Sequence, residues 1–177
     1  MHHKRFSLIL LLFPFLWINS IEMKNSFAIV PFYSIPNSKE LEKESLSIGK
    51  SAYQLLYFGQ FKESLNLAKL AISLNNKNET LWSILAEAQI ANNLHTKALK
   101  SLDEGKKINP MMSELYFAES NIYLSKENFN KAKKAIMKGL EIEPENTTAI
   151  FQLGNIHLME KNYFKAIKSF NKAIKLK

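Results

Sequence analysis

Residues 113–146, SELYFAESNIYLSKENFNKAKKAIMKGLEIEPEN, decide the fold, because their pattern returns 34 residues later in residues 147–177, TTAIFQLGNIHLMEKNYFKAIKSFNKAIKLK. Pro110 and Pro144 are separated by the same 34 residues. Followed backward, the period divides most of the chain into four units: 45–78, 79–112, 113–146 and 147–177, the last one shortened. A fixed period of this length predicts a solenoid, in which each unit buries its apolar face against its neighbours.

Small residues recur at the positions where the two helices of a unit must approach each other closely. The eighth position of the four units carries Ala52, Ala86, Ser120 and Gly154, and the twentieth carries Ser64, Ala98, Ala132 and Ala166. Larger apolar residues align at other positions, such as Leu74, Ile108, Ile142 and Leu176 at the thirtieth. Small side chains opposite large ones let antiparallel helices pack at about 8–10 Å.

These columns resemble the tetratricopeptide repeat, a helix–turn–helix unit of 34 residues. The fourth unit matches best, with Leu153-Gly154-Asn155 followed by Tyr163, Ala166, Phe170 and Ala173. Two residues depart from the family pattern, because Glu119 stands at a usually apolar seventh position and His157 replaces the common tyrosine at the eleventh. The resemblance implies an all-α fold, a right-handed superhelical α-solenoid of antiparallel helix pairs, over residues 39–177.

Eight helices are expected, two in each unit. The first members are predicted at 38–58, 79–92, 113–126 and 147–160, and the second members at 61–74, 95–108, 129–142 and 163–176. Each second helix must stop before the thirty-second position, which holds Asn76, Pro110 and Pro144. Asn37, with Glu40 three residues later, predicts a capping box at the start of the first helix.

Residues 1–28 follow a different pattern from the repeats. A basic start, MHHKR, precedes a mainly apolar run from Phe6 to Ile18, which is shorter than the roughly 20 residues of a membrane-spanning helix. We interpret 1–28 as a signal peptide, cleaved after Ala28 or Ser20, or as an uncleaved membrane anchor; a buried or misannotated start is a third interpretation. Residues 29–38, with two prolines, indicate a linker. Both leading interpretations predict an exported or membrane-anchored protein with its repeats on the non-cytosolic side.

The composition disfavours catalytic chemistry. The chain has no cysteine, which excludes disulfides, thiolate metal sites and cysteine catalysis. Its five glycines form no phosphate-binding loop, and His95 and His157 occupy core-type positions in different units. We therefore predict no enzymatic activity, no metal and no cofactor. An enzymatic alternative would need an unrecognised site at His157 or Glu119.

In the tetratricopeptide family, the first helices of the units usually line a concave ligand-binding face. By that resemblance, positions two, five, nine, twelve and thirteen form a largely apolar groove suited to an extended peptide or an amphipathic helix. The predicted groove residues are Tyr53, Tyr57, Glu87, Ile90, Phe117, Asn121, Leu124, Phe151, Asn155 and Leu158, with Leu56 and Met159 at the same positions. The alternative is that several of these side chains pack against adjacent helices. The groove lacks the lysine and arginine clamp with which some family members bind chaperone C-termini.

The formal net charge of +8 comes almost entirely from lysine, since Arg5 is the only arginine. Lys97, Lys131 and Lys165 occupy the nineteenth position, and Lys100, Lys134 and Lys168 the twenty-second. Residues three apart share one helix face, so these six lysines predict two basic columns on the convex side. Such columns indicate either a solvated surface or a polybasic one for anionic membranes or acidic proteins. Nucleic acid is disfavoured, because arginine is the usual bidentate contact to guanine and phosphate.

Together these features predict a non-catalytic scaffold that binds a peptide or helix of a partner protein in a concave groove, in the context of membrane-complex assembly. The alternative function is a peripheral membrane adaptor that uses the lysine columns. The apolar stripe of the last helix consists of Ile167, Phe170 and Ile174. All or part of this stripe would be exposed to water, because no capping helix follows. Truncation of the sequence, docking on another protein and self-association are the three explanations.

Overall fold

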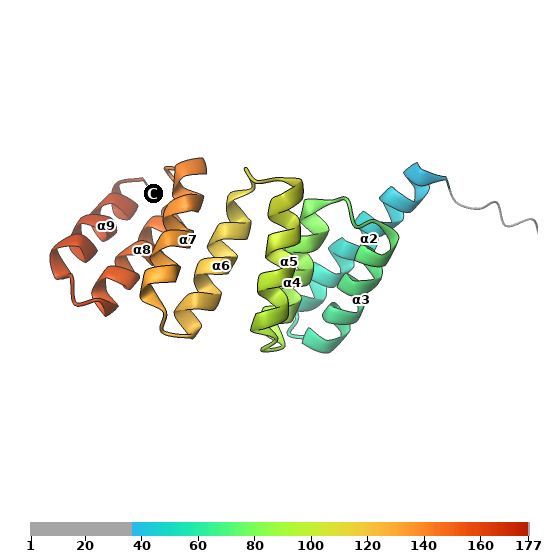
Figure 1. The fold of residues 1–177 in the computed structure, drawn as a ribbon, viewed down its shortest axis with the longest axis horizontal. Coiled ribbons are helices and arrows are strands. Elements are labelled where there is room, and N and C mark those ends of the chain that lie inside the picture. Colours follow the sequence, from blue (N-terminus) through green and yellow to red (C-terminus); the bar gives the residue numbers. More distant parts are fainter. Residues whose placement is uncertain (1–36, 177) are drawn as a thin grey trace, which may run out of the picture. The chain divides into compact units, whose positions relative to one another are not determined.

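The computed structural model describes residues 37–176, which contain eight α-helices and no strand (Figure 1). The helices are α2 (Ser38–Tyr57), α3 (Phe61–Leu74), α4 (Glu79–Ala91), α5 (His95–Ile108), α6 (Ser113–Ser125), α7 (Phe129–Ile142), α8 (Thr147–Met159) and α9 (Tyr163–Lys175). The segment interpreted as a signal peptide or anchor, residues 1–28, lies outside the described residues, as does most of the predicted linker. Both stay predictions.

The all-α prediction is confirmed, and the helix bounds agree closely with the expected ranges. α3, α5 and α7 span the expected residues, while the other five helices end one residue earlier than expected. The capping box forms at the start of α2: the Glu40 amide donates to Asn37 Oδ1 and the Asn37 amide donates to Glu40 Oε2, both at 3.0 Å. Ser38, assigned to the linker, is therefore the first residue of α2.

The helices form an all-α solenoid of four antiparallel pairs. Each first helix packs against the second helix of its own unit, and each second helix packs against the first helix of the next. α4 also contacts α2 and α6, so neighbouring first helices touch each other. Figure 1 shows the pairs following one another in chain order from α2 to α9. The right-handed sense of the superhelix stays a prediction.

Small buried residues bring the two helices of each pair together, as expected. The eighth and twentieth positions are buried in all four units. Where one of them is a serine, its hydroxyl finds a partner across the pair: Ser64 Oγ donates to the Ala52 carbonyl at 2.8 Å, and Ser120 Oγ donates to the Ala132 carbonyl at 3.0 Å. A buried hydroxyl without a hydrogen-bond partner would destabilise the fold. Because these two hydroxyls are bonded, serine can occupy the same buried contact as alanine.

Two of the three joints between consecutive units use the backbone carbonyl at the thirty-second position as a hydrogen-bond acceptor. Trp82 Nε1 donates to the Asn76 carbonyl at 2.9 Å, and Tyr116 Oη donates to the Pro110 carbonyl at 3.0 Å. In both cases the donor stands at the fourth position of the following unit. Both carbonyls lie in the loop that follows a second helix, and each receives a hydrogen bond from the next helix.

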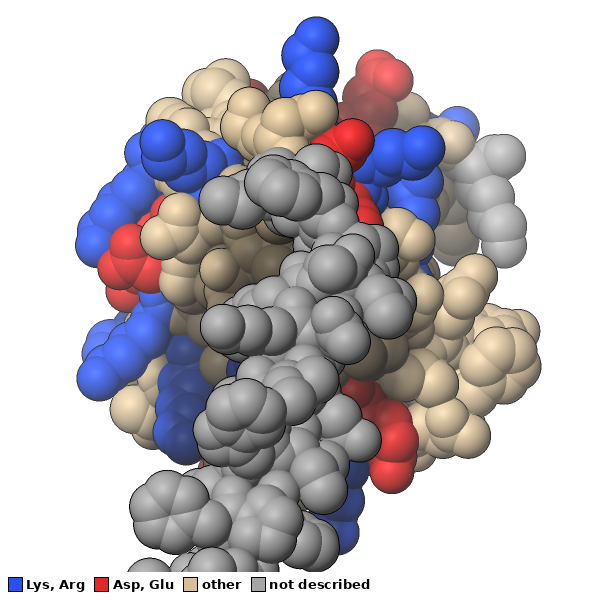
Figure 2. Space-filling model, turned by 90° about the vertical axis from the view of Figure 1, so that its right-hand side faces the viewer, with Lys and Arg blue, Asp and Glu red and all other residues tan. Residues whose placement is uncertain are grey.

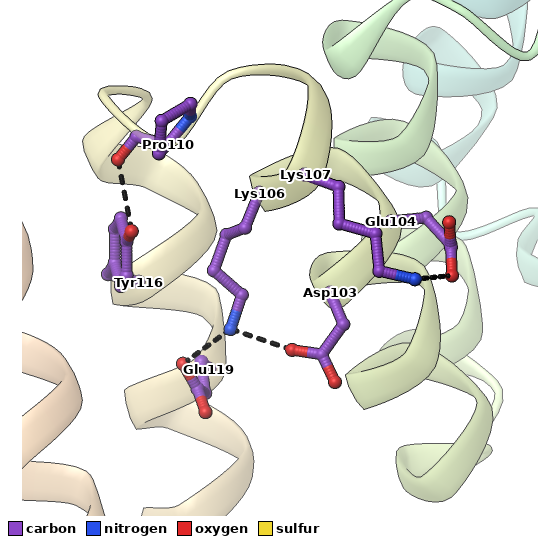
Figure 3. Close-up of polar contacts among 7 residues, drawn as sticks. All are labelled: Asp103, Glu104, Lys106, Lys107, Pro110, Tyr116 and Glu119. Carbon is purple, nitrogen blue, oxygen red and sulfur yellow. Dashed lines mark hydrogen bonds and ion pairs between the residues drawn. The ribbon is translucent and has the colours of Figure 1, made fainter.

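A salt bridge joins α5 to α6 and explains why Glu119 is tolerated at a usually apolar position. Lys106 Nζ lies 2.9 Å from Asp103 Oδ1 and 3.0 Å from Glu119 Oε2 (Figure 3). The side chains of Lys106 and Glu119 are only 18% and 19% exposed. Burial alone would lower the pKa of Lys106, but the hydrogen bonds to both carboxylates raise it, so the lysine stays charged.

Candidate binding face

The four first helices, α2, α4, α6 and α8, present a surface that we call the first-helix face. It consists of the side chains at positions two, five, six, nine, twelve and thirteen of each unit. Half of the predicted groove residues are exposed on the solenoid: Tyr53, Tyr57, Asn121, Phe151 and Leu158. Met159, at the same position as Tyr57, is also exposed. These residues give the face its apolar and aromatic character.

Other predicted groove residues lie partly in the core, as the packing alternative anticipated. Ile90 and Leu124 pack against hydrophobic clusters between the helix pairs. The Phe117 ring packs across Gly139 of α7, so closely that a Cβ atom at that glycine would overlap it. Phe117 therefore fills the α6–α7 contact, and its part in binding stays a prediction.

The polar residues of the face link neighbouring first helices. Gln152 Nε2 of α8 donates a hydrogen bond to Asn121 Oδ1 of α6, which holds the two amides side by side. Asn155, one turn further along α8, is partly buried. Amides have both donors and acceptors, so this group can pair with the backbone of a bound segment.

Two carboxylates stand close enough to interact on the α4–α6 part of the face. Burial raises the pKa of Glu87, and the nearby Glu114 raises it further. Neither carboxylate forms an ion pair with any residue of the 37–176 range. Glu87 is among the predicted groove residues, whereas Glu114 and Gln152 are not. Glu114 could have been found, because it is the only charged residue at the second position of the four units.

The six lysines of the predicted columns lie on α5, α7 and α9 and are all exposed. None of them forms an ion pair with a described residue, although Lys131 Nζ lies 5.4 Å from the centre of the Tyr123 ring. A depression beside Lys131 and Lys134 is lined by Tyr116 and Tyr123. Viewed along the row of helices, lysines gather mainly on the left flank, with others at the top and at the upper right (Figure 2).

The residues named for the enzymatic alternative belong to separate ion-pair groups. Glu119 is bound by Lys106, whereas His157 Nδ1 lies 3.4 Å from Glu160, which also accepts from Lys133 at 2.6 Å. The hydrogen bond from Lys133 lowers the pKa of Glu160. Within residues 37–176, no group of three His, Asp or Glu side chains is placed to hold a metal ion. No helix in that range has the length and hydropathy needed to span a bilayer.

The last helix exposes part of the stripe that the sequence indicated. Ile167 and Ile174 are 60% and 72% exposed. Phe170 is instead half-buried, because its ring packs over Gly154 and lies 5.1 Å from the ring centre of Phe151. Self-association through α9 stays a prediction.

This all-α solenoid matches the tetratricopeptide repeat family. Two family models described as tetratricopeptide repeat match residues 113–146 and 148–177. Residues 113–177 therefore contain two tetratricopeptide repeats.

Solved structures with a similar fold belong to the same class. TTC0263, a thermophilic tetratricopeptide protein in Thermus thermophilus, has 17% identity and a TM-score of 0.70 over 75% of this chain and 73% of that chain. MamA from Desulfovibrio magneticus RS-1 has 15% identity and a TM-score of 0.66 over 78% of each chain. The first repeat domain of Spaghetti (RPAP3), bound to the HSP90 peptide SRMEEVD, has 18% identity and a TM-score of 0.62 over 66% of this chain and 93% of that chain.

At these identities the likeness shows the fold alone. Among curated protein sequences, none matches this chain. Tetratricopeptide repeat proteins are generally non-catalytic scaffolds, and protein–protein interaction is the function that this family supports.

Proposed function

We propose that this protein is a non-catalytic scaffold that holds a peptide or short helix of a partner protein on its first-helix face. The observation that carries the proposal is the exposure of large apolar side chains on first helices at both ends of the solenoid. Tyr53 on α2 and Phe151 on α8 are 55% and 53% exposed, and Leu158 is 46% exposed. Exposed aromatic and aliphatic side chains of this size supply most of the binding energy in protein interfaces.

The amides of the face support the same proposal. Asn121 is exposed beside Gln152, and Asn155 lies on the same helix as Phe151. An extended peptide needs hydrogen-bond partners for its backbone, while a helix needs mainly apolar contacts at a spacing of three and four residues. A face that combines apolar side chains with amides can serve either ligand.

The test compares two exposed apolar surfaces of the same molecule. Immobilised full chain is used to capture partners from a membrane extract, beside a Phe151→Ala/Leu158→Ala variant and a Met137→Ala control. Met137 lies on α7 and is 52% exposed, so it matches Phe151 in exposure but belongs to a second helix. We expect the double variant to lose a partner that the control retains. Partners captured equally by all three proteins would contradict the proposal, provided that circular dichroism shows each variant folded.

The proposed setting is the assembly or maturation of a membrane complex on the non-cytosolic side of a membrane. Residues 1–28 support it, since their basic start and apolar run are typical of a signal peptide or an anchor. Fractionation of cells with a tag at the C-terminus tests this setting. A protein found only in the cytosol would contradict it without affecting the binding face.

A second candidate function is attachment to an anionic membrane surface through the lysine columns. It is favoured by the exposure of all six lysines and by their lack of ion pairs with described residues. Each lysine near an anionic bilayer contributes about 1 kcal/mol, and salt screens the attraction. Binding to phosphatidylserine vesicles that survives Phe151→Ala/Leu158→Ala but disappears in high salt would favour this function over the first.

A further inference from the structure

From the second unit onward, the first and second helices of the solenoid differ in charge. α5, α7 and α9 carry four lysines each, whereas α4, α6 and α8 carry no lysine and no arginine. The charged residues of the first-helix face on those three helices are Glu87 and Glu114. A ligand on this part of the face therefore meets apolar side chains, amides and two carboxylates. The face has one lysine, Lys50, at the sixth position of the first unit on α2, and most of the other lysines of the described residues lie on the second helices.

The carboxylates of the first-helix face lack the ion pairs that some other acids of residues 37–176 form, and Glu114 accepts a hydrogen bond only from the neighbouring Ser113 Oγ at 3.3 Å. Glu119, on the same helix as Glu114, is bound by Lys106, and Glu160 is bound by Lys133. Glu87 and Glu114 have no such cation among the described residues. The raised pKa of Glu87, caused first by burial and then by Glu114, reflects the same deficit. A partly buried carboxylate beside a like charge is costly, and an arriving cation offsets that cost.

Apolar side chains stand one helical turn from each carboxylate. Ile90 follows Glu87 on α4, and Phe117 follows Glu114 on α6, so each pair shares a helix face. Both apolar side chains also pack inside the solenoid, and only their partly exposed surface is open to a ligand. A lysine or arginine side chain suits such a place, because its long apolar stem packs on hydrophobic surface while its charged end reaches a carboxylate.

This inference rests on the proposed function. We propose that the segment bound by the first-helix face is basic and apolar, and that a lysine or arginine of the partner lies at Glu87 and Glu114. Charge complementarity favours this ligand over an acidic one. The peptide SRMEEVD held by the RPAP3 domain is acidic toward its end. In this chain, positions two, five and nine provide no cation to receive the carboxylates of such a peptide. Position two holds Leu46, Thr80, Glu114 and Thr148; position five holds Gly49, Ser83, Phe117 and Phe151; position nine holds Tyr53, Glu87, Asn121 and Asn155.

The experiment is selection of peptides from a random 16-residue display library against the full chain. Affinities of the selected peptides are then measured for the wild type and three variants. Glu87→Gln/Glu114→Gln removes the two carboxylates of the face, and Phe151→Ala/Leu158→Ala removes its apolar contacts. Glu104→Gln/Glu141→Gln is the matched control, because it changes the net charge equally on α5 and α7.

We expect selected peptides to combine apolar residues with lysine or arginine, and to bind Glu87→Gln/Glu114→Gln about tenfold more weakly, as for the loss of a charged hydrogen bond. The control should change affinity less than twofold. Neutral or acidic peptides that need Phe151 and Leu158 but not the two carboxylates would overturn this inference and leave the proposed function standing. Failure to select any peptide, or peptides indifferent to Phe151→Ala/Leu158→Ala, would overturn both.

Discussion

The turn inside each unit passes through a residue with left-handed backbone geometry at the same place, the fifteenth position. Gly59 has φ of 73°, and Asn93, Glu127 and Lys161 have φ between 54° and 59°. Glycine adopts this geometry without steric cost and asparagine tolerates it, whereas other residues pay roughly 1–2 kcal/mol. The third and fourth units therefore hold a strained residue where the first holds glycine.

At the residue scale, replacing Lys161 by glycine should stabilise the fold. Lys161 is exposed, so its side chain contributes little packing. We expect Lys161→Gly to raise the free energy of unfolding by about 0.5–1 kcal/mol, because relief of strain exceeds the added entropy of the unfolded chain. Urea denaturation measures the change. Lys161→Ala is the control, since it removes the side chain but keeps the strain, and an equal effect of both variants would contradict the explanation.

Residues that align in the sequence do not always share a role in the structure. Phe117 and Phe151 both stand at the fifth position, and the sequence assigned both to the groove. Gly139 gives Phe117 a surface to pack on. In the fourth unit alanine replaces that glycine, and Phe170 fills the space over Gly154 instead, so Phe151 stays half exposed. The period predicts which positions face each other, but which of two rings fills a space depends on glycine placement in that unit.

At the scale of elements, the helix joints differ in chemistry although their geometry repeats. The period, the small residues and the capping box were enough to predict the eight helices to within one residue. The same patterns could not predict the Lys106–Glu119 contact between α5 and α6. Its members come from different columns of adjacent units, and repetition does not specify which charges meet. Glu119 was visible only as a departure from the family pattern.

The second prediction concerns this joint. Lys106→Met alone should lower the free energy of unfolding by about 1–3 kcal/mol, because Glu119 would stay partly buried without its cation. The double variant Lys106→Met/Glu119→Leu should regain most or all of that loss, since an apolar pair restores the packing usual at the seventh position. Thermal and urea denaturation of both single variants and the double variant complete the cycle. A double variant as unstable as the sum of the single variants would contradict this account of the joint.

At the scale of the whole described solenoid, stability should vary along the row of helices. Each helix pair contacts only the adjacent pairs, so the inner pairs are covered on two sides and α9 on one. α4 buries seven residues, whereas α9 buries only Ala166 and Ala173. Proteins built from such units open one unit at a time, with a free energy set by the neighbouring contacts.

We therefore expect backbone amides of α9 to exchange hydrogen through local opening, at a free energy about 1–3 kcal/mol below that of α4 amides. Hydrogen exchange at low denaturant concentration measures both the free energy and its denaturant dependence, which should be smaller for α9 because little surface is exposed when it opens. Equal protection and equal denaturant dependence from α2 to α9 would mean a single cooperative unit and contradict the prediction. Repeating the measurement at increasing protein concentration tests self-association as well, because a second copy covering Ile167 and Ile174 would raise the protection of α9 by mass action and leave that of α4 unchanged.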